Sequence, residues 1–134
     1  IGYPIKIVED ILFDNLINLY GVAKIFWHAT GYGEDAEVSP VKFEHFGITT
    51  VEAMASGCVT IVIDSGGQPE IVTHGHNGYL WNSLDELVEY TLMIVHDEEL
   101  FSIIQKKGLE CRSRFSKELF RERVNQLLSE VMRG

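Results

Sequence analysis

Short runs of branched and aromatic residues recur along the chain and alternate with patterns of helical period. Such runs at residues 5–8 and 23–28 predict strands, because branched and aromatic side chains are favoured on a pleated sheet. Residues 59–63 form a continuous run without charge, which is typical of a strand covered on both faces. A turn at Asn77-Gly78 introduces a fourth, brief strand over residues 79–81.

Helical spacing of apolar positions separates these runs. Residues 11–20 predict a helix with Asp14 near its first turn, where a carboxylate suits the helix dipole. A second helix is predicted over 47–56, ended by Gly57, and a short third one from Pro69 through Val72. Three more close the chain, with N-terminal caps at Ser83 (in a capping box with Glu86), Asp97 and Ser116. The last carries one apolar face, formed by Leu119, Phe120, Val124, Leu127, Leu128 and Val131.

The alternation of strands and helices defines the fold class. It predicts an α/β domain, Rossmann-like, with a mostly parallel sheet and helices on both faces. Ligands of such folds bind beyond the carboxyl ends of the strands. The long loop over residues 30–47 and the turn at 65–68 both leave predicted strand ends, so we expect them to face one crevice.

Composition and charge narrow the class of protein. The 134 residues are 46% hydrophobic and 23% charged, which fits one globular domain over 1–134. The net charge is -9, but residues 1–105 hold three lysines against sixteen carboxylates, while 106–134 hold eight basic residues against four acidic ones. A chain this acidic predicts no nucleic-acid partner, because that binding depends on clustered Lys and Arg.

The two cysteines and the start of the chain bear on its compartment. Cys58 and Cys111 lie in patterns of buried segments, which favours reduced thiols over a disulfide and indicates a cytoplasmic setting. The chain opens on Ile1 without a basic leader, and its longest apolar run is too short to span a bilayer. We therefore expect a soluble chain that has been cut short.

The stretch EHFGITTVEAMASG holds the most informative polar residues. Glu44 and Glu52 stand eight positions apart around a predicted helix start, where Gly47 permits close approach of an anion to free N–H groups. A carboxylate one turn into that helix can accept hydrogen bonds from vicinal hydroxyls, such as those of a ribose. A sugar nucleotide contains both groups, although this spacing alone is common by chance.

The same stretch, followed by SGGQPEIV and NGYLW, resembles the retaining glycosyltransferases of family 4, which have the two-domain GT-B fold. LINLYGVAKIFWHATG resembles the segment that leads into their E-x7-E motif. The resemblance implies that Glu44 is the catalytic residue, lying against the donor sugar, and that Glu52 holds the ribose. The other implied donor-binding residues are His45, Phe46, Gly47 and Ile48 toward the sugar, Thr49 and Thr50 toward the diphosphate, and the turn of Gly66 and Gly67.

The resemblance also implies parts that this sequence lacks. Related C-terminal halves begin with further strand-helix units, which supply an Arg and a Lys for the diphosphate, and they follow an N-terminal acceptor domain. We therefore expect an incomplete C-terminal half that binds its donor weakly and is inactive alone. The parent enzyme is expected to use a nucleotide diphosphate-sugar, without cofactor or metal. Its acceptor is a saccharide, a lipid or a small molecule, and a lipid acceptor implies a peripheral position at the cytoplasmic membrane face.

Several alternatives stay open at this point. The same fold hosts sugar-nucleotide epimerases and phosphorylases, although neither Lys24 nor Lys42 has a recognisable setting for a pyridoxal Schiff base. A non-catalytic α/β binding module is a third possibility. Glu44 is either a nucleophile or a positioning group, and we favour positioning, because a carboxylate that binds sugar hydroxyls is poorly placed to attack the anomeric carbon. The pair His74 and His76 lacks a third metal ligand at suitable spacing.

Overall fold

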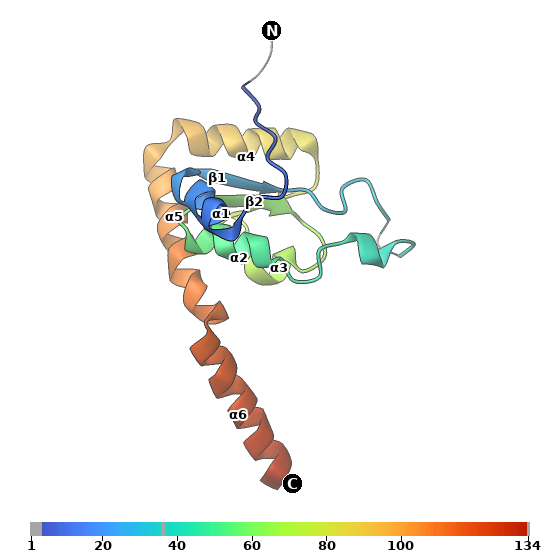
Figure 1. Ribbon diagram of the computed structural model, residues 1–134. Coiled ribbons are helices and arrows are strands. Elements are labelled where there is room, and N and C mark those ends of the chain that lie inside the picture. Colours follow the sequence, from blue (N-terminus) through green and yellow to red (C-terminus); the bar gives the residue numbers. More distant parts are fainter. Residues whose placement is uncertain (1–3, 36, 134) are drawn as a thin grey trace.

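A computed structural model describes residues 4–35 and 37–133 of the chain. Its centre is a three-stranded parallel sheet in the order β1 (Ile25–His28), β2 (Val59–Ile63), β3 (Tyr79–Trp81), as Figure 1 shows. Ile25 pairs with Val59 and Ile61 with Tyr79, so β2 has a neighbour on each side. The predicted parallel α/β sheet is confirmed, and with it three of the four predicted strands.

The helices follow the predicted order. α1 (Phe13–Val22) precedes β1, and α2 (Ile48–Ala55) and α3 (Gln68–Ile71) precede β2 and β3 respectively. α4 (Leu84–His96), α5 (Glu98–Cys111) and α6 (Lys117–Arg133) close the described chain, with short 3-10 helices η1 (Pro40–Lys42) in the long loop and η2 (Arg112–Phe115) before α6. The loop prediction is confirmed except at residue 36, which lies outside the described residues.

The helix caps occur where the sequence predicts them. The Ser83 hydroxyl accepts a hydrogen bond from the N–H of Glu86 at 3.2 Å, and the Asp97 carboxylate accepts one from Leu100 at 2.8 Å. The Glu86 carboxylate in turn accepts from the N–H of Asn82, at 2.7 Å, rather than from the cap residue itself. These bonds satisfy N–H groups that a helix start leaves free.

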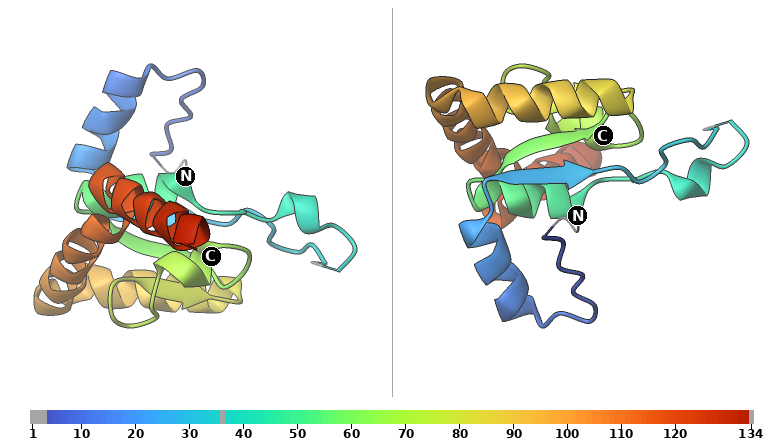
Figure 2. Two further views of the ribbon diagram at one scale, coloured as in Figure 1. Left: turned by 90° about the horizontal axis from the view of Figure 1, so that it is seen from below. Right: turned by 90° about the horizontal axis from the view of Figure 1, so that it is seen from above.

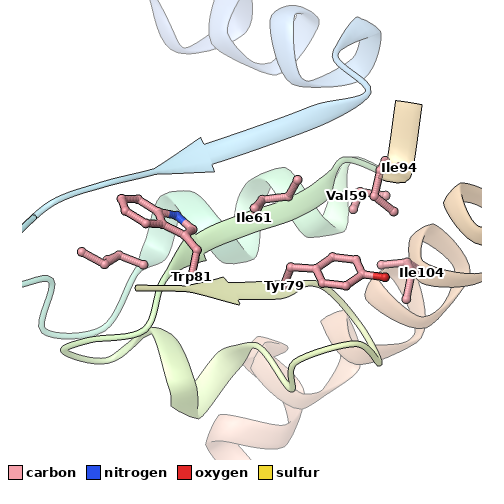
Figure 3. Packing of buried hydrophobic residues seen from close by; sticks show 7 residues of the cluster. Val59, Ile61, Tyr79, Trp81, Ile94 and Ile104 are labelled. Atoms are coloured by element: carbon pink, nitrogen blue, oxygen red, sulfur yellow. The ribbon is translucent and has the colours of Figure 1, made fainter. Parts of the chain in front are cut away.

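Two apolar layers cover the sheet. Alternation along β2 directs Val59, Ile61 and Ile63 to one face, where they pack with Trp81 and with side chains of α4 and α5 (Figure 3). Val62 points to the other face and packs with Met54 of α2 and with the residues around α3. Figure 2 shows α4 on one side of the sheet and α2 with α1 on the other. Helices on both faces are thus confirmed, and all five residues of β2 are buried.

Of the two elements predicted at the chain ends, one is wrong and the other is confirmed. The strand predicted over residues 5–8 is wrong: this segment pairs with no described strand, and Ile5 and Ile7 are 78% and 81% exposed. A branched run forms a strand only where a partner edge is available. α6 is the predicted helix, but it projects away from the sheet (Figure 1), and its apolar face is largely exposed, as at Phe120 and Val131. Cys58 and Cys111 are free thiols, as predicted.

Candidate functional site

A cleft opens beyond the carboxyl ends of the strands, between the long loop after β1 and the turn after β2. Its volume is about 330 Å³. Four of the predicted site residues line it, namely Glu44, His45, Gly66 and Gly67, together with Pro40, Phe43 and Glu70. The crevice expected from the two strand ends is therefore present, and it brings the first Glu of the motif against the Gly-Gly turn.

The Gly-Gly turn holds the Glu44 segment through its backbone. The N–H of Gly67 donates a hydrogen bond to the carbonyl oxygen of Glu44 at 2.7 Å. A Cβ atom on Gly66 would lie 2.3 Å from that oxygen, and one on Gly67 would lie 2.4 Å from the carbonyl oxygen of His45. Side chains at these positions are excluded by backbone atoms, so the two glycines permit the close approach that shapes the cleft.

The start of α2 offers free donors beside the cleft. Gly47 is the N-cap in the left-handed region, at φ 94°, and no described residue accepts a hydrogen bond from the N–H of Ile48 or Thr49. The N–H of Thr50 already donates to the carbonyl oxygen of Gly47 at 3.1 Å. The donors available to an anion are thus those of Ile48 and Thr49, while the contact implied for the backbone of Thr50 stays a prediction.

The Glu44 carboxylate faces a histidine that the sequence patterns did not single out. His28, the last residue of β1, places its Nε2 atom 3.4 Å from Oε2 of Glu44. Its Nδ1 atom lies 3.3 Å from Nε2 of the fully buried Gln68. His28 ends β1 and Gln68 begins α3, after the turn that follows β2. The place of His28 at the carboxyl end of a parallel strand is the signal in the sequence that identifies it as a candidate.

Glu52 lies outside this cleft, in a larger groove of about 590 Å³. The groove runs between α2 and the start of α6 and shares Glu70 with the cleft. Three cations from the basic C-terminal segment line it, namely Arg114, Lys117 and Arg123, together with the rings of Phe46, Phe115 and Phe120. Phe46 and Phe115 meet edge to face, with ring centroids 5.8 Å apart. The basic segment therefore supplies positive charge beside the second Glu of the motif.

Tyr20 and Cys58 lie near Glu52 on the side of α1. Burial raises the pKa of Tyr20, and the negative charges of Glu52 and of ionised Cys58 raise it further. Burial also raises the pKa of the Cys58 thiol. The Tyr20 hydroxyl and the Cys58 thiol thus stay protonated near neutral pH.

Residues 4–35 and 37–133 show neither a metal site nor a membrane-spanning helix. No cluster of three or more His, Cys, Asp or Glu there has the arrangement of a metal site. No helix of that part of the chain combines the length and apolar character needed to cross a membrane.

Comparison with known proteins identifies the family. Residues 10–111 match the family described as Glycosyl transferases group 1. The chain is 37% identical over 89 residues to the GDP-Man:Man(3)GlcNAc(2)-PP-Dol alpha-1,2-mannosyltransferase of Dictyostelium discoideum, a match that covers 66% of this chain and 17% of that protein. The chain belongs to the glycosyl transferases group 1 family. Its matches cover between 6% and 23% of the length of these curated relatives.

Solved structures share the fold. HepE of Anabaena in complex with UDP superposes with a TM-score of 0.69 at 23% identity, over 84% of this chain and 29% of that one. The C-terminal domain of the glycosyl transferase group 1 protein LpcC from Francisella tularensis gives a TM-score of 0.63 at 25% identity, over 81% of this chain and 50% of that one. The domain therefore has the architecture of a GT-B glycosyltransferase domain.

Proposed function

We propose that this chain is the donor-binding part of a retaining glycosyltransferase of family 4, which transfers a sugar from a nucleotide diphosphate-sugar without a metal or another cofactor. The observation that carries the proposal is the cleft in which Glu44 faces the Gly-Gly turn, beside the free N–H groups of Ile48 and Thr49. A carboxylate suits sugar hydroxyls, and helix-start amides suit a phosphate. One ligand that contains both groups can occupy the cleft and the helix start together.

The groove that holds Glu52 extends this proposal toward the nucleotide. Glu52 accepts hydrogen bonds from the ribose hydroxyls, and Arg114, Lys117 and Arg123 offset the charge of the diphosphate from the same groove. Glu70 lines both the cleft and the groove, so the two are neighbours on the surface. A long, charged donor is thus a better match to the cleft and the groove together than a small neutral ligand.

The chemical role of the site is electrostatic in this proposal. Charge develops on the leaving diphosphate as the glycosidic bond breaks, and preorganised N–H groups at the start of α2 stabilise it. Glu44 positions the sugar, because its carboxylate is already fixed beside His28. The backbone of His45 to Ile48 contacts the sugar, and the aromatic ring of Phe46 lines the neighbouring groove.

The printed names of relatives suggest which donors to test. The Dictyostelium relative is named as a GDP-Man-dependent enzyme acting on a dolichol-linked saccharide, and HepE was also solved with UDP-glucose. GDP-mannose and UDP-glucose are therefore the first donor probes. A saccharide, lipid-linked or small-molecule acceptor belongs to the whole protein, together with an N-terminal acceptor domain. The proposal includes a cytoplasmic setting, which the free thiols of Cys58 and Cys111 support.

The direct test is donor binding followed by nuclear magnetic resonance, with the chain labelled with ¹⁵N. We expect UDP-glucose or GDP-mannose to shift the amide signals of Gly47, Ile48, Thr49 and Gly67, in the presence of EDTA. Glu44→Gln is expected to weaken binding of the sugar nucleotide. Glu89→Gln is the control and should leave binding unchanged, because Glu89 belongs to α4, the helix on the opposite side of the sheet from α2. Shifts distributed away from α2 and the Gly-Gly turn, or no saturable binding of either donor, would contradict the proposal.

Retention is tested separately on a longer protein that includes the acceptor domain. The configuration at the anomeric carbon of the product, compared with that of the donor, decides between retention and inversion. A radiolabelled donor recovered as its own epimer, without a transferred product, would instead show an epimerase.

A further inference from the structure

A chain of polar contacts leads from the interior of the domain to the Glu44 carboxylate. The Thr50 hydroxyl lies 2.9 Å from Oε1 of Gln68, Nε2 of Gln68 lies 3.3 Å from Nδ1 of His28, and Nε2 of His28 lies 3.4 Å from Oε2 of Glu44. These residues come from α2, α3, the end of β1 and the long loop. The contacts therefore connect four segments that are far apart in the sequence.

Burial makes the direction of these contacts definite. Thr50 and Gln68 are fully buried, so a donor or acceptor left unpaired there costs about 1 to 3 kcal/mol. Oε1 of Gln68 accepts from the Thr50 hydroxyl, and its Nε2 then donates to Nδ1 of His28. A neutral imidazole whose Nδ1 accepts a hydrogen bond carries its proton on Nε2. That proton faces the carboxylate of Glu44.

The same amide supports the start of α2. A Cβ atom on Gly47 would lie 3.1 Å from Nε2 and 3.3 Å from Oε1 of Gln68, so the N-cap packs directly on the amide. Gln68 thus contacts the segment that presents free N–H groups as well as the histidine that faces Glu44. The Gln68 amide therefore lies between the start of α2, where we propose that the phosphate binds, and His28, which faces the carboxylate proposed to bind the sugar.

We propose that His28 is a positioning residue for Glu44, and that Gln68 and Thr50 fix the imidazole as the Nε2–H tautomer that performs this role. The proposal rests on the proposed function in one respect, namely that Glu44 binds the donor sugar. His28 has a side chain only 9% exposed, and that of Glu44 is 31% exposed, so the carboxylate reaches the cleft while the imidazole supports it from behind. His28 acts through Glu44 and makes no contact with the donor.

A core histidine without this role would contribute to stability alone. Replacement of such a histidine would affect the binding of UDP and of UDP-glucose equally, because both ligands need only the folded domain. A positioning residue affects the part of the affinity that comes from the sugar. The difference between the two ligands therefore separates the two roles.

The first experiment needs no donor. The nitrogen signals of the His28 imidazole in the ¹⁵N-labelled chain at neutral pH are expected to show a protonated Nε2 and an unprotonated Nδ1. Glu44→Gln should shift the Nε2 signal, and Gln68→Met should release the tautomer preference. Thr50→Val, which removes the hydroxyl that orients the amide, gives the same release should Gln68→Met fail to fold. A protonated Nδ1 in the wild-type chain, or an Nε2 signal that Glu44→Gln leaves unmoved, overturns the inference whatever the donor binds.

The second experiment measures the dissociation constants of UDP-glucose and UDP for His28→Ala. We expect about a tenfold weaker affinity for UDP-glucose, the equivalent of one hydrogen bond to a charged group, and an unchanged affinity for UDP. In the double variant with Glu44→Ala, the loss should not exceed that of Glu44→Ala alone, since His28 acts through Glu44. Equal losses for the two ligands, or additive losses in the double variant, would overturn the positioning role. Absence of binding by the wild-type chain would count against the proposed function, while the nitrogen signals still decide the contact.

Discussion

Replacement of Gly67 by Ala isolates the effect of close backbone approach at the site. Gly67 has φ -80°, which any residue adopts, so the substitution adds no backbone strain. The new Cβ atom would lie 2.4 Å from the carbonyl oxygen of His45 and 3.0 Å from Cα of Phe46. An ordinary contact between carbon and oxygen is about 3.4 Å, so the loop must retreat by roughly 1 Å.

The energetic cost of Gly67→Ala follows from that displacement. Overpacking against backbone atoms costs about 1 to 3 kcal/mol, and loss of the hydrogen bond from Gly67 to Glu44 costs about 1 kcal/mol more. We therefore expect the free energy of unfolding to fall by about 2 to 4 kcal/mol. That is a large share of the stability of about 5 to 15 kcal/mol that is typical of a domain.

Three other glycines provide matched controls for urea unfolding. Gly21 has open space around it and lies in α1, so Gly21→Ala is expected to be neutral or to stabilise by up to about 1 kcal/mol. Gly75 is also open but has φ 71°, and Gly75→Ala should cost about 1 to 2 kcal/mol from that conformation alone. Gly66 combines φ 58° with crowding, so it should cost the most. A cost for Gly67→Ala no larger than that for Gly75→Ala, with unchanged m-values, would refute the reasoning.

Three further predictions concern other parts of the fold. Ser83→Ala and Asp97→Ala should each lower the free energy of unfolding by about 1 kcal/mol in urea titrations, because each removes a cap of a long helix. Ser129→Ala, at an exposed position in α6, is the control, and an equal loss there would contradict the assignment of the caps. The folded state should lose stability as pH rises through and above the ordinary Cys pKa of 9.0, since burial raises the pKa of Cys58 and the thiol of the unfolded chain releases its proton first. Cys58→Ala should make the fall of the free energy of unfolding with pH shallower, and an unchanged fall in that variant would contradict this account. Truncation after Ser116 should change the free energy of unfolding by less than about 1 kcal/mol, because α6 projects from the body, and a large loss in calorimetry would show that the helix packs on it.

Elements with strong local signals were predictable from the sequence. Residues 59–63 are buried on both faces, and the caps at Ser83 and Asp97 depend on contacts within one turn, so their patterns were sufficient. The strand predicted over residues 5–8 failed because a strand needs a partner edge, which local sequence does not reveal. The exposure of the apolar face of α6 was not predictable either, since periodicity predicts a helix and does not show what covers its apolar face.

The sequence predicted which residues of the candidate site lie in the cleft, but it did not predict the side-chain contacts between distant segments. Strand ends placed Glu44 and the Gly-Gly turn in one cleft, as expected from the order of the elements. Glu52 instead lies in the neighbouring groove, and basic residues from the end of the chain line that groove as well. His28 and Gln68 were missed because their contact spans 40 positions and depends on how two strand ends are juxtaposed.

Complete burial of β2 has a consequence for the chain before it folds. Val59–Ile63 is a short segment of high β propensity, without charge or proline, and such segments pair readily with copies of themselves when exposed. In the folded domain both of its edges are occupied, by β1 and β3, and both of its faces are covered. The exposed carboxylate of Asp64 follows directly and opposes stacking of identical strands through charge repulsion. Until β1 and β3 pair with it, however, the segment stays available to other chains, so refolding at high protein concentration should favour aggregates that begin at β2. The strand that organises the sheet is thus also the one whose early pairing protects the chain.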